Sequence, residues 1–376
     1  MKILFTGGGS GGHFYPIIAI VQEINAIVQQ EKYVEPKYYY MSDNPYDEKV
    51  LFEYNITFIH APAGKLRIYF SPKNIFDGFR TFYGICVALV KLFILFPDVV
   101  VCKGGYAAFP PVFAARILRI PVVIHESDSI PGRVNIFAGK FAKRVGIAYE
   151  EAANFFKKNL TALVGVPIRR ELVTPMRVGA HEFLKLDKTV PVIMVLGGSQ
   201  GAQNINDIVV DILPELLKSY QVIHQVGSLN IAGIKDRLNI VLGTTEHKER
   251  YKMFGFLNNT ALAMSAGVSS LVITRAGSTL IFEIAGWGLP SIVIPIPRDV
   301  SRDQQRNALN FARSGASVLL EESNLTPHIL LSEIDRIMTS PDIQKQMSER
   351  ARAFARPEAA RKMAEVILSL VLSHER

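Results

Sequence analysis

The chain has 376 residues, of which 49% are apolar and 20% charged, and its formal net charge is +8. These proportions exclude a disordered chain, and the length exceeds what one hydrophobic core usually serves, so we expect two domains. The two cysteines, Cys86 and Cys102, exclude a disulfide framework and a cysteine zinc site, and they favour a reducing cytoplasm. Because residue 1 leads directly into a predicted strand, we expect no secretory signal peptide.

The first half of the chain alternates short apolar runs with longer segments of helical periodicity. Strands are predicted over residues 2–5, 38–41, 57–60, 98–102, 122–125, 144–148 and 162–164, and helices over 16–30, 76–96 and 111–118. Strands that alternate with helices favour a parallel sheet with right-handed crossovers. The first half is therefore predicted to be one α/β domain.

The pattern starts again after a connector that contains proline and charged residues. Strands are predicted over residues 192–196, 222–226, 240–242, 251–254, 271–274, 291–294 and 317–320, and a last amphipathic helix over 357–372. That helix could close the second domain or return to the first. The predicted division is an N-terminal domain over 1–166, a connector over 167–189, a C-terminal domain over 190–356 and a closing helix over 357–376.

Two glycine-rich turns, at residues 7–13 and 197–202, each follow a predicted strand and open an amphipathic segment. Glycines at such a place let backbone N–H groups and the positive end of a helix face an anion. One such turn is weak evidence of function. Two turns at matching places in two halves predict a pair of nucleotide-fold domains that face each other across a cleft.

Residues 64–91 combine five cations with one carboxylate and many bulky apolar side chains. This mixture suits a helix that rests on an anionic membrane surface, and it also suits a helix whose apolar stripe packs on the sheet. The candidate membrane patch comprises Lys73, Ile75, Phe76, Phe79, Arg80 and Phe82. Lys91 interrupts the apolar run over 85–96, which is also shorter than the ~20 residues of a spanning helix, so we expect peripheral attachment only.

Several motifs recur here in a characteristic order. They lie at residues 8–13, 125–128, 131–135, 164–169, 197–202, 275–277 with Glu283, and 303–308. Together they resemble the MurG family, bacterial transferases that add N-acetylglucosamine from UDP-N-acetylglucosamine to a lipid-linked muramyl-pentapeptide. The resemblance runs from residue 1 to about 320 and includes the closing helix. It implies a GT-B fold, with two Rossmann-like α/β domains, the acceptor on the N-terminal one and the nucleotide sugar on the C-terminal one.

The donor site is predicted from two strand-end loops in the second half. Ser199 and Gln200 can add side-chain donors to a diphosphate that faces the second glycine turn, and Arg275 can add a guanidinium. The resemblance implies further donor contacts from Gly277 and Ser278 in the same loop as Arg275, from Glu283 to the ribose, from Phe256 and Leu257 to the uracil, from Gln304 and Gln305 to the sugar, and from Arg169 at the domain junction. The chain departs from the family pattern at Val166, where asparagine is common, and in the order Ser278-Thr279.

Catalysis requires a base for the acceptor hydroxyl, and two residues compete for that role. His13 follows the first glycine turn and can titrate near neutral pH. Asp128 offers a carboxylate where many family members have asparagine. The first turn, comprising Gly9, Ser10, Gly11, Gly12 and His13, can also cradle the acceptor pyrophosphate, which would make His13 a phosphate partner. The expected mechanism is an inverting single displacement.

The sequence contains no Asp-x-Asp, so we expect no cofactor and no strict metal requirement. The resemblance implies UDP-N-acetylglucosamine, a lipid-linked acceptor, an anionic membrane surface and other cell-wall synthesis proteins as partners, at the cytoplasmic face of the bacterial cell membrane. No nucleic-acid recognition motif is present. The alternatives are a related transferase with another lipid acceptor, a UDP-sugar epimerase, and a nucleotide-binding scaffold without activity.

Overall fold

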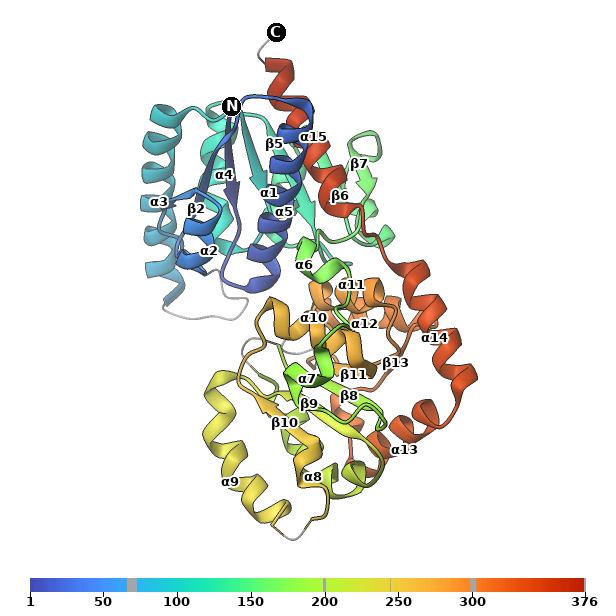
Figure 1. The fold of residues 1–376 in the computed structure, drawn as a ribbon. Coiled ribbons are helices and arrows are strands. Elements are labelled where there is room, and N and C mark those ends of the chain that lie inside the picture. The colour runs from blue at the N-terminus through green and yellow to red at the C-terminus, as the bar shows by residue number, and fades with distance from the viewer. Residues whose placement is uncertain (66–72, 199–200, 244, 298–301, 375–376) are drawn as a thin grey trace. The chain divides into compact units, whose positions relative to one another are not determined.

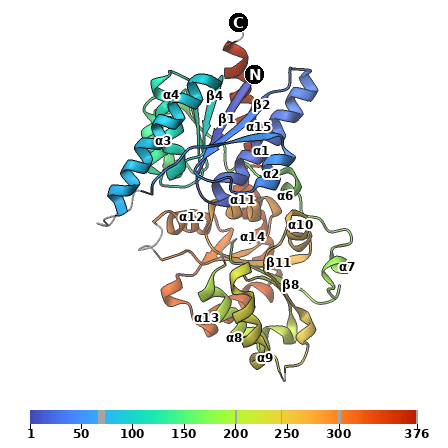
Figure 2. The same ribbon diagram turned by 90° about the vertical axis from the view of Figure 1, so that its left-hand side faces the viewer.

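The computed structural model describes residues 1–376 apart from 66–72, 199–200, 244, 298–301 and 375–376. It consists of two compact units. Unit 1 comprises Met1–Arg169 and Arg356–Arg376, and unit 2 comprises Arg170–Ala355. Each unit is a twisted parallel sheet with helices on both faces (Figures 1 and 2).

The sheet of unit 1 has seven strands in the order β3-β2-β1-β4-β5-β6-β7. The strands are β1 (Lys2–Thr6), β2 (Lys37–Ser42), β3 (Ile56–His60), β4 (Val99–Cys102), β5 (Val122–Glu126), β6 (Arg144–Ile147) and β7 (Thr161–Leu163). Its helices are α1 (Gly11–Glu31), α2 (Glu48–Glu53), α3 (Lys73–Leu95), α4 (Phe109–Ile117), α5 (Arg133–Gly139) and α15 (Ala359–His374), with 3-10 turns η1 (Tyr106–Ala108), η2 (Glu150–Phe155) and η3 (Lys158–Leu160).

Alternating strand residues build two cores on the two faces of this sheet. On one face, Ile3 and Phe5 pack with buried residues of α1 and α15. On the other face, Leu4 packs with residues of α3, α4 and α5. Figure 1 shows α15, in red, beside α1, in blue. The closing helix therefore lies in unit 1.

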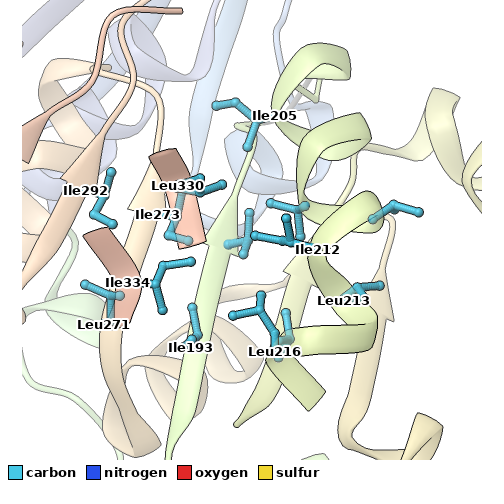
Figure 3. Close-up of a cluster of buried hydrophobic side chains, with 14 of the residues drawn as sticks. Ile193, Ile205, Ile212, Leu213, Leu216, Leu271, Ile273, Ile292, Leu330 and Ile334 are labelled. Atoms are coloured by element: carbon cyan, nitrogen blue, oxygen red, sulfur yellow. The ribbon is translucent and has the colours of Figure 1, made fainter. Parts of the chain in front are cut away.

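The sheet of unit 2 has six strands in the order β10-β9-β8-β11-β12-β13. The strands are β8 (Val192–Leu196), β9 (Gln221–Gln225), β10 (Tyr251–Phe254), β11 (Ser269–Thr274), β12 (Ser291–Val293) and β13 (Ser317–Leu319). Its helices are α6 (Arg170–Val173), α7 (Ala180–Leu184), α8 (Gln203–Ser219), α9 (Ile231–Val241), α10 (Asn259–Val268), α11 (Ser278–Trp287), α12 (Arg302–Arg313), α13 (Pro327–Met338) and α14 (Pro341–Phe354), with 3-10 turns η4 (Ser228–Asn230), η5 (Lys248–Arg250) and η6 (Glu322–Asn324). Figure 3 shows the core that strands β8 and β11 form with α8 and α13.

One predicted strand, over residues 240–242, is wrong. Ile240 and Val241 end helix α9. The residues Ile231, Ile234, Leu238 and Val241 recur at helical spacing, and their side chains contact the core of unit 2. The run was too short to be told from the end of a helix.

The chain divides after Arg169, so residues 170–189 of the expected connector belong to unit 2. Their short helices α6 and α7 pack against α10, and α6 also contacts α11. The indole Nε1 of Trp287 donates a hydrogen bond to the carbonyl of Leu172 at 2.7 Å. These contacts make the segment a structural part of unit 2.

Candidate functional site

The candidate acceptor site of unit 1 forms where the carboxyl ends of β1, β4 and β5 meet. Strands β1 and β4 are neighbours, and the chain leaves them toward opposite edges of the sheet, which is where open α/β sheets bind ligands. The turns after these two strands touch, because a Cβ placed on Gly105 would lie 2.9 Å from the Cα of Gly8. Gly104 and Gly105 have φ values of 87° and 82°, which favour glycine. The absence of a side chain at Gly105 also lets the turn approach Gly8 closely.

His13 lies in the first turn of α1, next to the N-cap Ser10. Its ring Nδ1 lies 2.9 Å from the hydroxyl of Ser10. Burial, and then the positive charge of Lys103, lowers the pKa of His13 to about 4. This pKa lies below the near-neutral value expected from the sequence, because the half-buried ring lies near the cation of Lys103. The ring is neutral at physiological pH, which is the state that a base requires.

Asp128 stands on a loop that the buried carboxylate of Glu126 holds in place. Oε1 of Glu126 accepts a hydrogen bond from the backbone N–H of Asp128 at 2.9 Å. Oε2 accepts from the N–H of Gly132 at 3.0 Å and from Nδ2 of Asn135 at 2.8 Å. Burial, and then the charge of Asp128, raises the pKa of Glu126 to about 7. Asp128 is partly exposed at the same sheet edge as His13.

Sequence reasoning missed two residues of this site, Lys103 and Tyr106. Lys103 is buried at the end of β4, and its Nζ donates a hydrogen bond to the hydroxyl of Ser127. Tyr106 begins η1, and its hydroxyl lies 3.4 Å from Oδ2 of Asp43. The signal was a charged residue between an apolar strand and the pair Gly104-Gly105, a place that resembles the other strand-end turns.

In unit 2, the side chain of Gln225 connects the second glycine turn with Phe256 and Leu257, the residues expected to contact the uracil. Nε2 of Gln225 donates to the carbonyl of Gly198 at 3.1 Å, and its Oε1 accepts from the N–H of Leu257 at 3.0 Å. Leu257 is buried and Phe256 is exposed. Ser199 and Gln200 lie outside the described residues.

Arg275 is fixed by a partner that the sequence did not reveal. Its Nη1 forms an ion pair with Oε2 of Glu322 at 2.6 Å and lies 3.3 Å from the carbonyls of Ile294 and Pro295. The other carboxylate oxygen of Glu322 accepts a hydrogen bond from Asn204 in the first turn of α8. The guanidinium is therefore held beside the second glycine turn.

Helix α11 begins at Ser278, directly after the N-cap Gly277. The hydroxyl of Thr279 is buried there and has no hydrogen-bond partner among the described residues. Glu283 is buried on the same helix, with 5% of its surface exposed. Both side chains are polar groups at the carboxyl edge of the sheet, where the expected diphosphate and ribose would bind.

The remaining predicted donor residues have partners of their own. Oε1 of Gln304 accepts from the N–H of Ile296 at 3.4 Å, and Nε2 of Gln305 lies 3.3 Å from Oε1 of Glu321. The guanidinium of Arg169 stacks on the ring of Tyr15 in α1, with 3.8 Å to the centroid. Arg169 thus belongs to unit 1, at its boundary with unit 2.

The candidate membrane patch lies on α3. Phe76, Phe79 and Phe82 are exposed, with 76% of Phe76 accessible. Arg80 pairs with Asp43 through a contact of 2.7 Å, so its charge is partly neutralised. The side chains of Lys73 and Ile75 lie outside the described residues.

Helix α3 exposes a longer apolar face than the sequence indicated. We define the α3 face as Phe76, Phe79, Phe82, Tyr83, Val90, Phe93 and Ile94, all of them exposed. Phe76–Leu95 is, within the described part of the chain, the one helical segment long and apolar enough to cross a membrane. Ala88 and Leu92 of this helix nevertheless belong to the core on the sheet, which ties α3 to unit 1.

Among the described residues, no group of three or more His, Cys, Asp or Glu side chains could hold a metal ion.

Comparisons with known proteins show to which family the chain is similar. The model of the glycosyltransferase family 28 N-terminal domain matches residues 3–147, and that of the C-terminal domain matches residues 192–363. A Bacillus cereus relative is 35% identical over 92% of this chain and 93% of its own length, and it is named UDP-N-acetylglucosamine–N-acetylmuramyl-(pentapeptide) pyrophosphoryl-undecaprenol N-acetylglucosamine transferase 2. The chain belongs to the MurG family. A second relative of the same kind, from Treponema denticola, is 32% identical over 99% of this chain and 98% of its own length.

Solved structures show the fold of the MurG family in this chain. Acinetobacter baumannii MurG matches with a TM-score of 0.71 at 24% identity, over 98% of this chain and 99% of that one. A UDP-GlcNAc 2-epimerase from Neisseria meningitidis matches with a TM-score of 0.68 at 14% identity, over 98% and 100%. The prediction of a GT-B fold with two parallel-sheet domains is confirmed. The chain is a UDP-sugar glycosyltransferase by family, as predicted.

Proposed function

We propose that this chain transfers N-acetylglucosamine from UDP-N-acetylglucosamine to undecaprenyl-pyrophosphoryl-N-acetylmuramyl-pentapeptide, in the synthesis of peptidoglycan. The observation that carries the proposal is the identity of 32–35% with relatives of that name over 92–99% of the chain. Both sets of strand-end loops that such a reaction needs are present, one in each unit. Other cell-wall synthesis proteins are expected partners.

In the proposed reaction, the acceptor hydroxyl attacks the anomeric carbon of the sugar. His13 or Asp128 takes the hydroxyl proton as the new C–O bond forms, and the bond to UDP breaks with inversion. Departing UDP carries negative charge, which the N-terminus of α11 and the guanidinium of Arg275 would stabilise. Unit 2 would hold the nucleotide, and unit 1 the lipid-linked acceptor.

The test is release of UDP from UDP-N-acetylglucosamine with and without the lipid-linked acceptor. We expect release only with that acceptor, together with a disaccharide product. Release with diacylglycerol instead would indicate a transferase for another lipid. Conversion of the sugar without any acceptor would indicate the epimerase, whose fold is similar.

We further propose that the reaction needs no metal ion, because the protein's own dipoles and Arg275 would meet the diphosphate charge. We expect kcat to change by less than about twofold after dialysis against EDTA. Recovery of lost activity on adding Mg²⁺ or Mn²⁺ would contradict this. The measurement is UDP release in matched buffers with and without chelator.

We propose that the enzyme binds peripherally to the cytoplasmic face of the cell membrane through the α3 face. An acceptor on a lipid keeps its pyrophosphate at the membrane surface, so unit 1 must approach the headgroups. Exposed phenylalanines on one helix suit burial at the boundary between headgroups and acyl chains. The core contacts of Ala88 and Leu92 support attachment rather than crossing.

Replacing Phe79 and Phe93 together by serine should weaken binding to vesicles that contain anionic lipid by about tenfold or more, because two aromatic side chains that would enter the lipid are lost. Co-sedimentation at low and high salt measures this. Phe52→Ser is the matched control, since Phe52 is 86% exposed on α2 of the same unit. Equal binding of the double variant and the control would return α3 to a purely structural role.

A further inference from the structure

Lys103 is a buried cation that the proposed reaction does not yet use. Of the lysines and arginines that the structure describes, it is the one that is buried, with 2% of its surface exposed. Lysine is almost never fully buried unless it is paired. It follows the apolar strand β4 and precedes Gly104, so it lies at the point where the sheet order reverses.

The side chain of Lys103 lies between the two loops that carry the candidate bases. On one side, a Cβ placed on Gly7 would lie 3.2 Å from the Cβ of Lys103 and 3.5 Å from that of His13. On the other side, Nζ donates a hydrogen bond to the hydroxyl of Ser127, the residue before Asp128. One ammonium group therefore adjoins both the first glycine turn and the loop held by Glu126.

Charges on several elements act on this ammonium. The titratable groups that interact with it are Cys102 of β4, His125 and Glu126 of β5, Asp128 of the following loop, and His13 of α1. Burial lowers the pKa of Lys103 to about 8, and the carboxylates of Glu126 and Asp128 act against this lowering. The side chain thus stays mostly protonated at neutral pH. In return, its charge contributes to the lowered pKa of His13.

We propose that Lys103 is a positioning residue of the acceptor site, whose buried ammonium adjoins the turn of His13 and holds the loop of Asp128 through Ser127. This inference rests on the proposed function. Lys103 acts through its neighbours, because its nitrogen is sealed from solvent and already bonded to Ser127. The arrangement serves either candidate base, since the positive charge opposes protonation of the imidazole and attracts the carboxylate.

A structural role alone would not require a charge here. Desolvating an ammonium is costly, and an apolar side chain of similar length often replaces a buried charge without loss of stability. Buried charges placed beside candidate bases in an active site are typical of groups that tune proton transfer. Lys103→Met therefore separates the charge from the volume of the side chain.

The experiment compares Lys103→Met with wild type and with Lys140→Met, an exposed lysine of the same unit. Two readouts are used: titration of the His13 ring by NMR, and kcat as a function of pH. We expect the pKa of His13 to rise in Lys103→Met, and kcat to fall about 10- to 100-fold, most at low pH. KM for UDP-N-acetylglucosamine should change by less than about twofold. Lys140→Met should match wild type in both readouts.

An unchanged titration of His13, or a loss of kcat that is equal at every pH, would overturn the proposal. Lys103→Arg is the second variant, because it keeps a cation that does not deprotonate; it should return the His13 titration toward that of wild type. If neither variant folds, Lys103 is structural and the proposal fails. If His13 responds as expected but wild type transfers no sugar, the proposed function fails while the coupling of Lys103 to His13 stands.

Discussion

Substituting the base of the acceptor site is expected to lower kcat by about 100- to 10,000-fold while leaving UDP affinity nearly unchanged. The variants are His13→Ala and Asp128→Asn, because these two side chains lie at the sheet edge where the acceptor turns meet. Steady-state UDP release gives kcat, and calorimetry gives the affinity for UDP. The variant that has lost the base should show the large effect.

His328→Ala is the control, since His328 is exposed on α13 and far along the chain from the acceptor turns. A loss confined to KM for the acceptor would make the substituted residue a binding group. Near-normal turnover in both variants would remove both candidates. In wild type, a kcat/KM profile that falls through pH 6.5 would contradict His13 as the base, because the pKa of His13 is about 4 and activity should persist well below neutral pH.

Alanine at Gly201 should reduce UDP affinity by at least about tenfold, because the second glycine turn cannot hold its shape with a side chain there. Gly201 has a φ of 77°, and its added Cβ would lie 2.4 Å from the carbonyl of Val226. Calorimetry on the full chain measures the affinity. The matched control is Gly233→Ala in helix α9, where nothing lies within 4 Å of the added Cβ. Equal affinities in the two variants would place the nucleotide elsewhere.

Calorimetry of UDP binding to unit 2 alone tests whether this unit contains the complete nucleotide site. A fragment of residues 170–355 should bind UDP, although it lacks Arg169 of unit 1. It begins at Arg170, because α6 and α7 pack against α10 and a Cβ on Gly267 would lie 2.1 Å from the carbonyl of Met176. A folded fragment that binds no UDP would show that unit 1 contributes essential contacts.

Strands could be predicted from the sequence where runs of β-branched residues lie between proline or glycine residues. The strand Val99–Cys102, between Pro97 and Gly104, is an example. The strand predicted over residues 240–242 was wrong, because a run of three apolar residues carries no periodicity of its own; the first two of them end helix α9. The glycine turns were predictable because strand, turn and helix follow directly along the chain. The local sequence pattern was therefore sufficient for features that neighbouring residues of the chain form by themselves.

The electrostatics of the site could not be predicted, because they depend on residues distant in sequence. Lys103 reads as a solvated residue after a strand until the fold places His13 beside it. Arg275 and Glu322 lie 47 positions apart, and only folding reveals their ion pair. The lowered pKa of His13 could not be predicted for the same reason, because it depends on neighbours that only the folded unit brings near the ring.

The return of α15 to unit 1 has a consequence for the order in which the protein matures on the ribosome. Unit 2 is one continuous stretch, so all of its residues have been synthesised before helix α15 is made. The core of unit 1 still lacks Met363, Ile367 and Val371 at that moment, and its helix α1 has no cover on that side. Domains usually mature from the N-terminus onward during translation. Here the unit that starts first is completed last, and a chain that ends near residue 355 would contain every residue of unit 2 but would lack α15 of unit 1.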